Sequence, residues 1–85
     1  MNDKLKAKIC NIVGSVMDIE INSLDENLQF SSIPKWDSFN NLMLISKFQD
    51  EFNIEFTAVE IESTKRIKDL FILIERKTSN LNQHI

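Results

Sequence analysis

Hydrophobic residues recur every three or four positions along three segments of the chain, which is the spacing of one face of an α-helix. These segments run from about Asp3 to Met17, from about Ser38 to Phe52 and from about Ile67 to Lys77. The pattern predicts three main helices, each with one face in a shared core. The repeated positions are Leu5, Ile9, Ile12, Val13 and Val16 in the first segment, Leu44, Ile45, Phe48 and Phe52 in the second, with Leu42 at the edge of its face, and Ile67, Leu70, Phe71 and Ile74 in the third.

A short fourth helix is predicted from Thr57-Ala58-Val59-Glu60, which has the form of a capping box. In this motif the side chains at both ends accept hydrogen bonds from each other's backbone N–H groups, and we expect the helix to end at about Glu62. The preceding stretch, Ile54 to Phe56, alternates apolar and polar residues, and we predict a loop there. The whole pattern predicts an all-α fold, a small four-helix bundle of three main helices and one short helix.

A long loop separates the first two helices, because Asp18 to Trp36 shows no periodicity and contains a proline. Connections of this length are often functional or packed by their own side chains, and we expect Leu24, Leu28 and Phe30 to anchor this one.

Gly14 interrupts the apolar pattern of the first helix. A glycine inside a helix costs about 1 kcal/mol relative to alanine. Either the helix ends early or close packing requires a residue without a side chain, and the sequence leaves both explanations open.

Length and composition describe a single ordinary domain. The chain has 85 residues, of which 42% are hydrophobic and 27% charged. The net charge of −3 and pI of about 5.0 argue against nucleic-acid binding, which needs a basic face. No apolar run approaches the length of a membrane-spanning helix, and the N-terminus lacks the apolar core of a signal peptide. We therefore expect a cytoplasmic protein without membrane insertion.

Trp36-Asp37-Ser38-Phe39 is the stretch most informative about chemistry. Aspartate is a preferred N-cap, so Asp37 would place Ser38 on the first residue of the second helix. The hydroxyl then lies beside unpaired N–H donors at the positive end of the helix dipole, where a covalently attached anion is stabilised. By itself, an Asp-Ser pair is far more often an ordinary helix cap.

Residue types that support catalysis are scarce, since the chain has one cysteine, one histidine and one glycine. These counts argue against an internal disulfide, a zinc site, a Cys-His dyad and a glycine-rich phosphate loop. We interpret Cys10 as a small semi-buried side chain, while His84 lies in a polar tail. A candidate modification site such as Ser38, with no general base to activate it, is more typical of an enzyme's substrate than of an enzyme. We therefore expect no catalytic residue and no metal-binding residue.

Several stretches around Ser38 have a recognisable pattern. They are the lead-in Ile33-Pro34-Lys35-Trp36, the motif Asp37-Ser38-Phe39 followed by Leu42 and Leu44, and the run Phe48-Gln49-Asp50-Glu51-Phe52-Asn53-Ile54-Glu55-Phe56. In these features the chain resembles the acyl carrier protein family, over a stretch from roughly Leu5 to Lys77. The resemblance implies a carrier domain over residues 1–78 and a polar C-terminal tail over residues 79–85.

The resemblance also implies a modification and a role. In that family the matching serine is esterified with 4′-phosphopantetheine, which points to Ser38. A phosphopantetheinyl transferase, holding Mg²⁺ in its own site, would supply the group from coenzyme A, and the Ser38 hydroxyl would attack the β-phosphate. Asp37 would cap the helix and help the transferase to recognise the serine. The terminal thiol would carry acyl groups as thioesters from a loading ligase to acyltransferases or synthases of fatty-acid, polyketide or surface-polysaccharide biosynthesis.

Phe39 and Met43 fall outside the inner arc of the second helix and form a candidate docking pair beside Ser38. The alternative, in which the long loop covers both, stays open. Carriers of this family typically present an acidic second helix, but here Asn40, Met43 and Gln49 stand at positions that are often acidic. We therefore expect partners to rely more on apolar contact and less on electrostatic steering.

Further residues are assigned to partner docking or to a cargo groove between the second and third helices. A place in the core is equally consistent for each of the groove residues. A second departure from the family pattern is Ser63-Thr64-Lys65-Arg66-Ile67, where a threonine replaces an aliphatic residue and a Lys-Arg pair adds positive charge. The docking assignments are Asp50, Phe56 and Ile61, and the groove assignments are Ile54, Phe56, Val59 and Ile61.

Two other functions remain open from the sequence. The same scaffold could carry an amino acid loaded by an adenylating enzyme, although the sequence before Ser38 lacks the Gly-Gly typical of peptidyl carriers. The chain could instead be an unmodified helical interaction module in which Asp37-Ser38 is only a cap. Its free-standing length favours a monomer that delivers cargo between separate enzymes.

Overall fold

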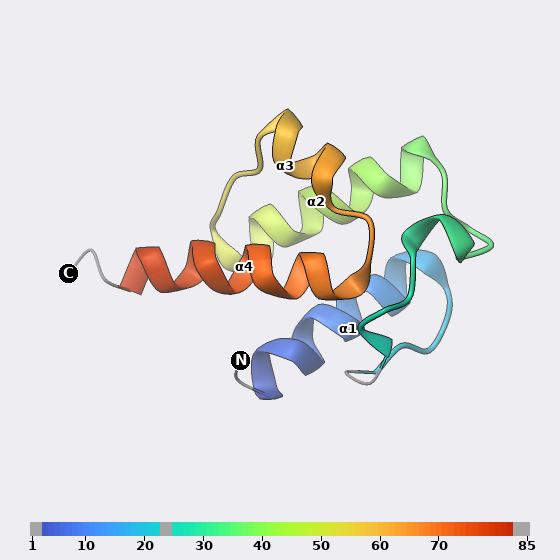
Figure 1. Ribbon diagram of the computed structural model, residues 1–85, viewed down its shortest axis with the longest axis horizontal. Coiled ribbons are helices and arrows are strands. Elements are labelled where there is room, and N and C mark those ends of the chain that lie inside the picture. Colours follow the sequence, from blue (N-terminus) through green and yellow to red (C-terminus); the bar gives the residue numbers. More distant parts are fainter. Residues whose placement is uncertain (1–2, 23–24, 83–85) are drawn as a thin grey trace.

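The computed structural model describes residues 3–22 and 25–82. Leu24 and His84, named above, lie outside the described residues. The all-α prediction is confirmed within this part of the chain, where three main helices and one short helix follow one another without a strand (Figure 1). The helices are α1 (Asp3–Met17), α2 (Ser38–Phe52), α3 (Ala58–Ser63) and α4 (Ile67–Asn82), and a short 3₁₀ helix, η2 (Phe30–Ser32), lies in the connection between α1 and α2.

The predicted bounds of α1 and α2 agree with those observed, whereas α4 continues past its predicted end at Lys77. The apolar repeat marks only the length over which a helix packs on its neighbours, and polar residues can prolong the helix beyond it. Residues 79–82 of the predicted tail therefore belong to α4, and residues 83–85 lie outside the described ranges. None of the helices described is both long and apolar enough to cross a bilayer.

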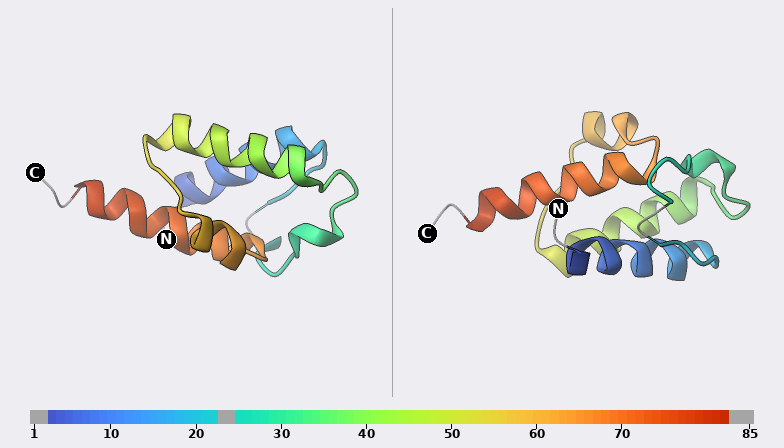
Figure 2. Two further views of the ribbon diagram at one scale, coloured as in Figure 1. Left: turned by 90° about the horizontal axis from the view of Figure 1, so that it is seen from above. Right: turned by 60° about the horizontal axis from the view of Figure 1, so that its bottom comes forward.

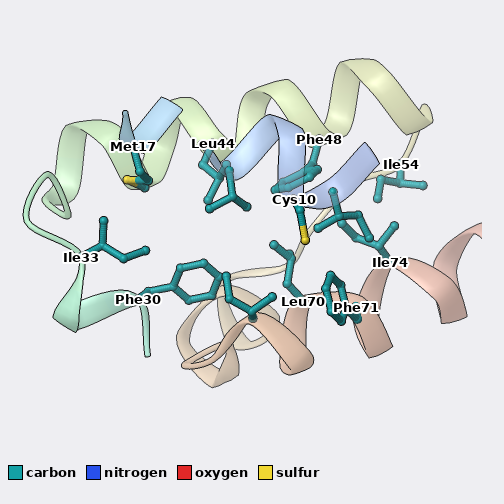
Figure 3. Close-up of a cluster of buried hydrophobic side chains, with 13 residues drawn as sticks. Cys10, Met17, Phe30, Ile33, Leu44, Phe48, Ile54, Leu70, Phe71 and Ile74 are labelled. Atoms are coloured by element: carbon teal, nitrogen blue, oxygen red, sulfur yellow. The ribbon is translucent and has the colours of Figure 1, made fainter. Parts of the chain in front are cut away.

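A single hydrophobic core lies between α1, α2 and α4, and α3 lies at its outer edge (Figures 1 and 2). Side chains from all three main helices and from the long loop point toward one another in this core (Figure 3). One expectation was wrong, because Leu42 is 65% exposed rather than at the edge of the buried face. It lies about 100° in helical rotation from the buried stripe, and no other element covers that side of α2. The buried residues are Ile9, Cys10, Val13, Met17, Phe30, Ile33, Leu44, Phe48, Ile54, Ile67, Leu70, Phe71, Leu73 and Ile74.

The long loop is anchored by Phe30, which is buried, and by Leu28, which packs against the core. Its backbone also pairs with the segment that begins α4. The Phe30 N–H donates to the Lys65 carbonyl at 3.0 Å, and the Ile67 N–H donates to the Leu28 carbonyl at 3.0 Å. The predicted anchoring by Leu28 and Phe30 is thus confirmed, and an isolated antiparallel bridge between Gln29 and Arg66 accompanies it.

Gly14 is required by close packing, and α1 does not end there. Asp18 adopts a left-handed conformation with φ of 58°, which turns the chain back so that the Ile19 N–H donates to the Gly14 carbonyl at 3.1 Å. This is the bonding pattern that commonly terminates helices. A Cβ atom on residue 14 would lie 2.6 Å from the Ile19 carbonyl oxygen.

Replacing Gly14 with alanine is expected to lower the free energy of unfolding by about 1 kcal/mol or more, because the overlap with a backbone oxygen outweighs the gain in helix propensity. Urea denaturation of Gly14→Ala against the parent protein measures the change. Ser15→Ala is the matched control, since Ser15 is exposed on the same helix and its replacement should be neutral or slightly stabilising. A Gly14→Ala protein more stable than its parent would contradict the packing explanation.

Candidate functional site

Ser38 is the first residue of α2, and its helix is capped as predicted. The Asp37 carboxylate accepts a hydrogen bond from the Asn40 N–H at 2.7 Å, and the Asp37 carbonyl accepts one from the Asn41 N–H at 2.9 Å. The Asn40 side-chain amide donates to the Lys35 carbonyl at 2.7 Å. These bonds hold the residues before and after the serine in one conformation.

The position of Ser38 is also tied to the hydrophobic core. The Trp36 ring stacks on the Phe30 ring with centroids 5.2 Å apart and planes 22° apart. The Trp36 N–H donates to the Ile33 carbonyl at 3.0 Å, and both Phe30 and Ile33 are buried. The serine therefore stands on a short extension of the core rather than on a freely moving loop.

The Ser38 side chain is exposed, and its hydroxyl makes no hydrogen bond to any residue that the structure describes. It lies in the first turn of α2, where backbone N–H groups point outward without helical partners. Around it, the described residues hold no group of three His, Cys, Asp or Glu side chains that could bind a metal ion. The local geometry offers an accessible hydroxyl in a field that favours negative charge.

A groove of about 550 Å³ lies next to this first turn. Trp36 precedes Ser38 by two residues and Asn41 follows it by one helical turn, and both line the groove. The opposite wall comes from α3 and from the residues that join α3 to α4. The groove is also lined by Gln29, Phe30, Ser31, Ile61, Glu62, Thr64, Lys65 and Arg66.

Of the residues predicted to line a groove, Ile61 lines this one and Ile54, Phe56 and Val59 do not. Ile54 is buried in the core, and Phe56 is half-buried with the Lys77 ammonium 5.8 Å from its ring centroid. Val59 is 72% exposed and borders a separate hollow between α3 and α4. Val59 and Ile61 are two residues apart on α3, about 200° in helical rotation, so they face different sides of this short helix.

The outer face of α2 carries three exposed apolar side chains, Phe39, Leu42 and Met43, which we name the α2 apolar patch. Their exposed fractions are 68%, 65% and 37%, so the long loop does not cover them. The sequence pattern identified Phe39 and Met43, but it missed Leu42 because that residue was assigned to the edge of the buried face. Asp50, the acidic residue assigned to docking, is exposed further along α2 and lines a hollow with Lys47 and Glu51.

The short helix α3, which forms one wall of the groove, has no buried residue. Its N-terminus has the predicted capping box: the Glu60 N–H donates to Thr57 Oγ1 at 3.1 Å, and the Thr57 N–H donates to Glu60 Oε1 at 2.9 Å. The Lys77 ammonium, on α4, lies 2.9 Å from the Glu60 carboxylate. The hydrogen bond from Lys77 and that from the Thr57 N–H hold the pKa of Glu60 below its ordinary value of 4.5.

Cys10 has no part in this site. It is buried in the core, and burial raises the pKa of its thiol above the ordinary value of 9.0. The side chain therefore stays a neutral thiol and acts as a small apolar group, more deeply buried than the sequence indicated.

Solved structures with the same arrangement of helices identify the fold. The crystal structure of the acyl carrier protein from Thermotoga maritima has 28% sequence identity and a TM-score of 0.75, over 92% of this chain and 91% of that one. The solution NMR structure of the holo acyl carrier protein from Geobacter metallireducens has 24% identity and a TM-score of 0.80, over 92% and 90% of the two chains. The chain has the fold of the acyl carrier proteins.

The likeness to acyl carrier proteins covers the whole bundle and not a single pair of helices, since it takes in nine-tenths of each chain. No protein-family model and no curated protein sequence matches the chain. The resemblance to acyl carrier proteins, stated from the residues around Ser38, is therefore confirmed at the level of the fold.

The attachment of α3 to α4 is expected to depend on pH through Glu60. Because its folded pKa is lowered, the Glu60–Lys77 pair contributes stability above pH 4.5, and this contribution is lost as the pH falls through the folded pKa. A Lys77→Met protein should therefore be less stable than the parent near neutral pH, with a difference that shrinks in acid.

Urea denaturation of both proteins across the acid range measures this difference in the free energy of unfolding. Lys68→Met is the control, because Lys68 is an exposed lysine near the start of the same helix. A Lys77→Met deficit that stays constant from neutral pH into acid would show that the Glu60 charge is not its cause.

Proposed function

We propose that this protein is an acyl carrier whose Ser38 is modified with 4′-phosphopantetheine. The observation that carries the proposal is the placement of Ser38 on the first residue of α2, in a fold shared with acyl carrier proteins. Its side chain is exposed, and its hydroxyl makes no hydrogen bond to the residues that the structure describes. The surroundings of Ser38 can accommodate phosphopantetheine. The hydroxyl is open to a modifying enzyme, and a groove begins beside it that can receive part of a long arm.

The reaction at Ser38 is a transfer of phosphopantetheine from coenzyme A by a separate transferase. The Ser38 hydroxyl oxygen forms a bond to the β-phosphorus, the bond from that phosphorus to the adenosine-bisphosphate portion breaks, and the hydroxyl proton passes to a base of the transferase. Asp37 fixes the serine by capping α2 and gives the transferase an adjacent carboxylate to recognise. Once attached, the group supplies a terminal thiol that holds an acyl cargo as a thioester.

The chain itself supplies a mount, a groove and a docking face rather than catalytic groups. Its partners would be the transferase, a loading ligase and the acyltransferases or synthases that use the cargo. Fatty-acid, polyketide and surface-polysaccharide biosynthesis all employ cargo of this kind. The α2 apolar patch beside Ser38 is the proposed docking face, and Asp50, Phe56 and Ile61 are further residues assigned to docking.

Ser38→Ala is expected to abolish modification completely, since it removes the oxygen that forms the new bond. The protein is incubated with coenzyme A, Mg²⁺ and a phosphopantetheinyl transferase, and its intact mass is recorded. Ser46→Ala, on an exposed position of the same helix, should gain one phosphopantetheine like the parent.

Failure of the folded parent protein to gain this mass with either a broad-specificity or a cognate transferase would refute the proposal. The unmodified interaction module would then be the better description. A gain that persists in Ser38→Ala would place the attachment site on another residue.

Truncation of the α2 apolar patch is expected to weaken docking without unfolding the protein, because these side chains are exposed. Leu42→Ala and Phe39→Ala should each lower the kcat/KM of modification by about tenfold if they are central to the interface. Ile72→Ala is the matched control, since Ile72 is 60% exposed but lies on α4. An equal effect of all three substitutions would argue against the patch.

The same assay tests how strongly charge affects the association of the protein with the transferase. The patch carries no charged side chain, so raising the salt concentration from low to physiological values should change kcat/KM by no more than about threefold. A steep loss of rate over that range would show that acidic residues such as Asp50 and Glu51 dominate the encounter.

A further inference from the structure

The middle of α4 carries apolar side chains on all sides. The run from Leu70 to Ile74 consists of five consecutive apolar residues, and four of them are buried. The fifth, Ile72, lies on the side of the helix opposite the core and is 60% exposed. A helix that is apolar all round is normally covered on every side, whereas Ile72 is left mostly uncovered by the described residues. The outer side of α4 therefore has the composition of a contact surface.

A second exposed apolar side chain lies close to Ile72. Val59, on α3, is 72% exposed and borders the same hollow of about 310 Å³ between α3 and α4. The buried side chain of Leu73 also borders this hollow. Exposed apolar residues that gather at one place indicate a contact site, whereas single scattered ones do not.

Four charged side chains surround Ile72 in a regular order on α4. Residues three and four positions away from a helical residue flank it on alternate sides. The pair on one side is Lys68 and Glu75, and the pair on the other side is Asp69 and Arg76. Within each pair, one charge precedes Ile72 and the opposite charge follows it. We name the two exposed apolar side chains and these four charges the α3–α4 face.

This order of charges is complementary to itself. When two copies of α4 lie antiparallel with their Ile72 side chains together, Lys68 of one copy faces Glu75 of the other. On the opposite side of the helix, Asp69 of one copy faces Arg76 of the other. A two-fold axis makes each contact twice, so four pairs of opposite charge surround the apolar centre. Among these residues, no like charges come together.

The charged side chains of the face are open to a partner. Lys68 is exposed and makes no ion pair with the described residues. Asp69 accepts both of its hydrogen bonds through Oδ2, which leaves Oδ1 without a donor among those residues. The Arg76 side chain is 61% exposed, and it has five N–H donors for its single contact with Glu60 at 3.9 Å.

We propose that the α3–α4 face is a site of self-association, at which a second copy of this chain packs its α4 antiparallel across Ile72. The face contains no residue of α2, and α2 and α4 lie on different sides of the core (Figure 2). Both copies therefore keep Ser38 and the α2 apolar patch accessible. The monomer expected from the sequence is then the form at low protein concentration.

The size of the face sets the strength of the association. A stable interface buries about 800 Å² on each partner, which is about one-seventh of the 5663 Å² surface of this chain. The α3–α4 face offers only two exposed apolar side chains. We therefore expect a weak complex, which forms at millimolar concentration and dissociates at micromolar concentration.

Sedimentation equilibrium of the unmodified full chain measures the association. The apparent mass should rise from 9.9 kDa toward twice that value between micromolar and millimolar protein. Ile72→Ala should lower the association constant by about tenfold, because apolar contact is lost on both copies. Leu42→Ala is the matched variant, since Leu42 is 65% exposed but lies on α2, and it should leave the association constant unchanged.

Charge reversal tests the antiparallel arrangement. Lys68→Glu and Glu75→Lys should each lower the association constant by about tenfold, because like charges then face each other twice. A mixture of the two variants should associate nearly as strongly as the parent, since each reversed charge meets an opposite charge on the other copy. Lys47→Glu, the same charge change on an exposed position of α2, should have little effect. Urea denaturation establishes that each variant is folded.

Other results would overturn the inference. An apparent mass that stays at 9.9 kDa up to millimolar protein would exclude self-association. Association weakened by Leu42→Ala and not by Ile72→Ala would place the contact on the α2 apolar patch. A mixture that does not recover would reject the antiparallel arrangement. If the chain stays monomeric and the amide NMR signal of Ile72 shifts on addition of the transferase, the face binds that enzyme and not a second copy.

Discussion

The backbone pairing between the long loop and the start of α4 is the interaction on which the rest of the structure depends. The first N–H groups of a helix have no partner within it. In α4 the loop supplies partners for two of them, because the Ile67 and Lys68 N–H groups donate to the Leu28 and Glu26 carbonyls at 3.0 and 2.7 Å. Asp69 accepts from the N–H groups of the two residues before the helix. A long connection is thereby fixed without a strand of its own.

This pairing places Phe30 in the core, and Phe30 in turn supports Trp36 and the start of α2. The contacts that anchor the loop therefore also position Ser38. The same pairing builds the groove, since Phe30 and Lys65 are bonded to each other through their backbones and both line it. Loss of the loop anchor would disturb the serine and the groove together, although the helices could still form.

The short helix α3 is held in a different way from the rest of the bundle. It buries no residue, and the polar contacts that hold it include the Thr57–Glu60 capping box and the ion pairs of Glu60 with Lys77 and Arg76. Elements with few buried apolar contacts open at a lower free-energy cost than the global unfolding of the protein. Within the groove wall, α3 is thus the part that is most easily displaced.

The features that the sequence predicts depend on interactions between residues close together in the chain. The helices α1 and α2, the Asp37 cap and the Thr57–Glu60 capping box could be predicted because each depends on residues within a few positions of one another. The sequence alone also determined that Ser38 would begin a helix. Its likeness to acyl carrier proteins was evident from the residues around that serine.

The tertiary structure decided what depends on distant segments. Leu42 became exposed because no element covers its side of α2, and Gly14 proved necessary only once Ile19 was seen to fold back on it. The groove wall could not be read from helical spacing, since Lys65 reaches it through pairing with a loop that lies far away in sequence. Local patterns fix which residues form a helix and how it begins, whereas packing between segments fixes which faces are covered and where a groove forms.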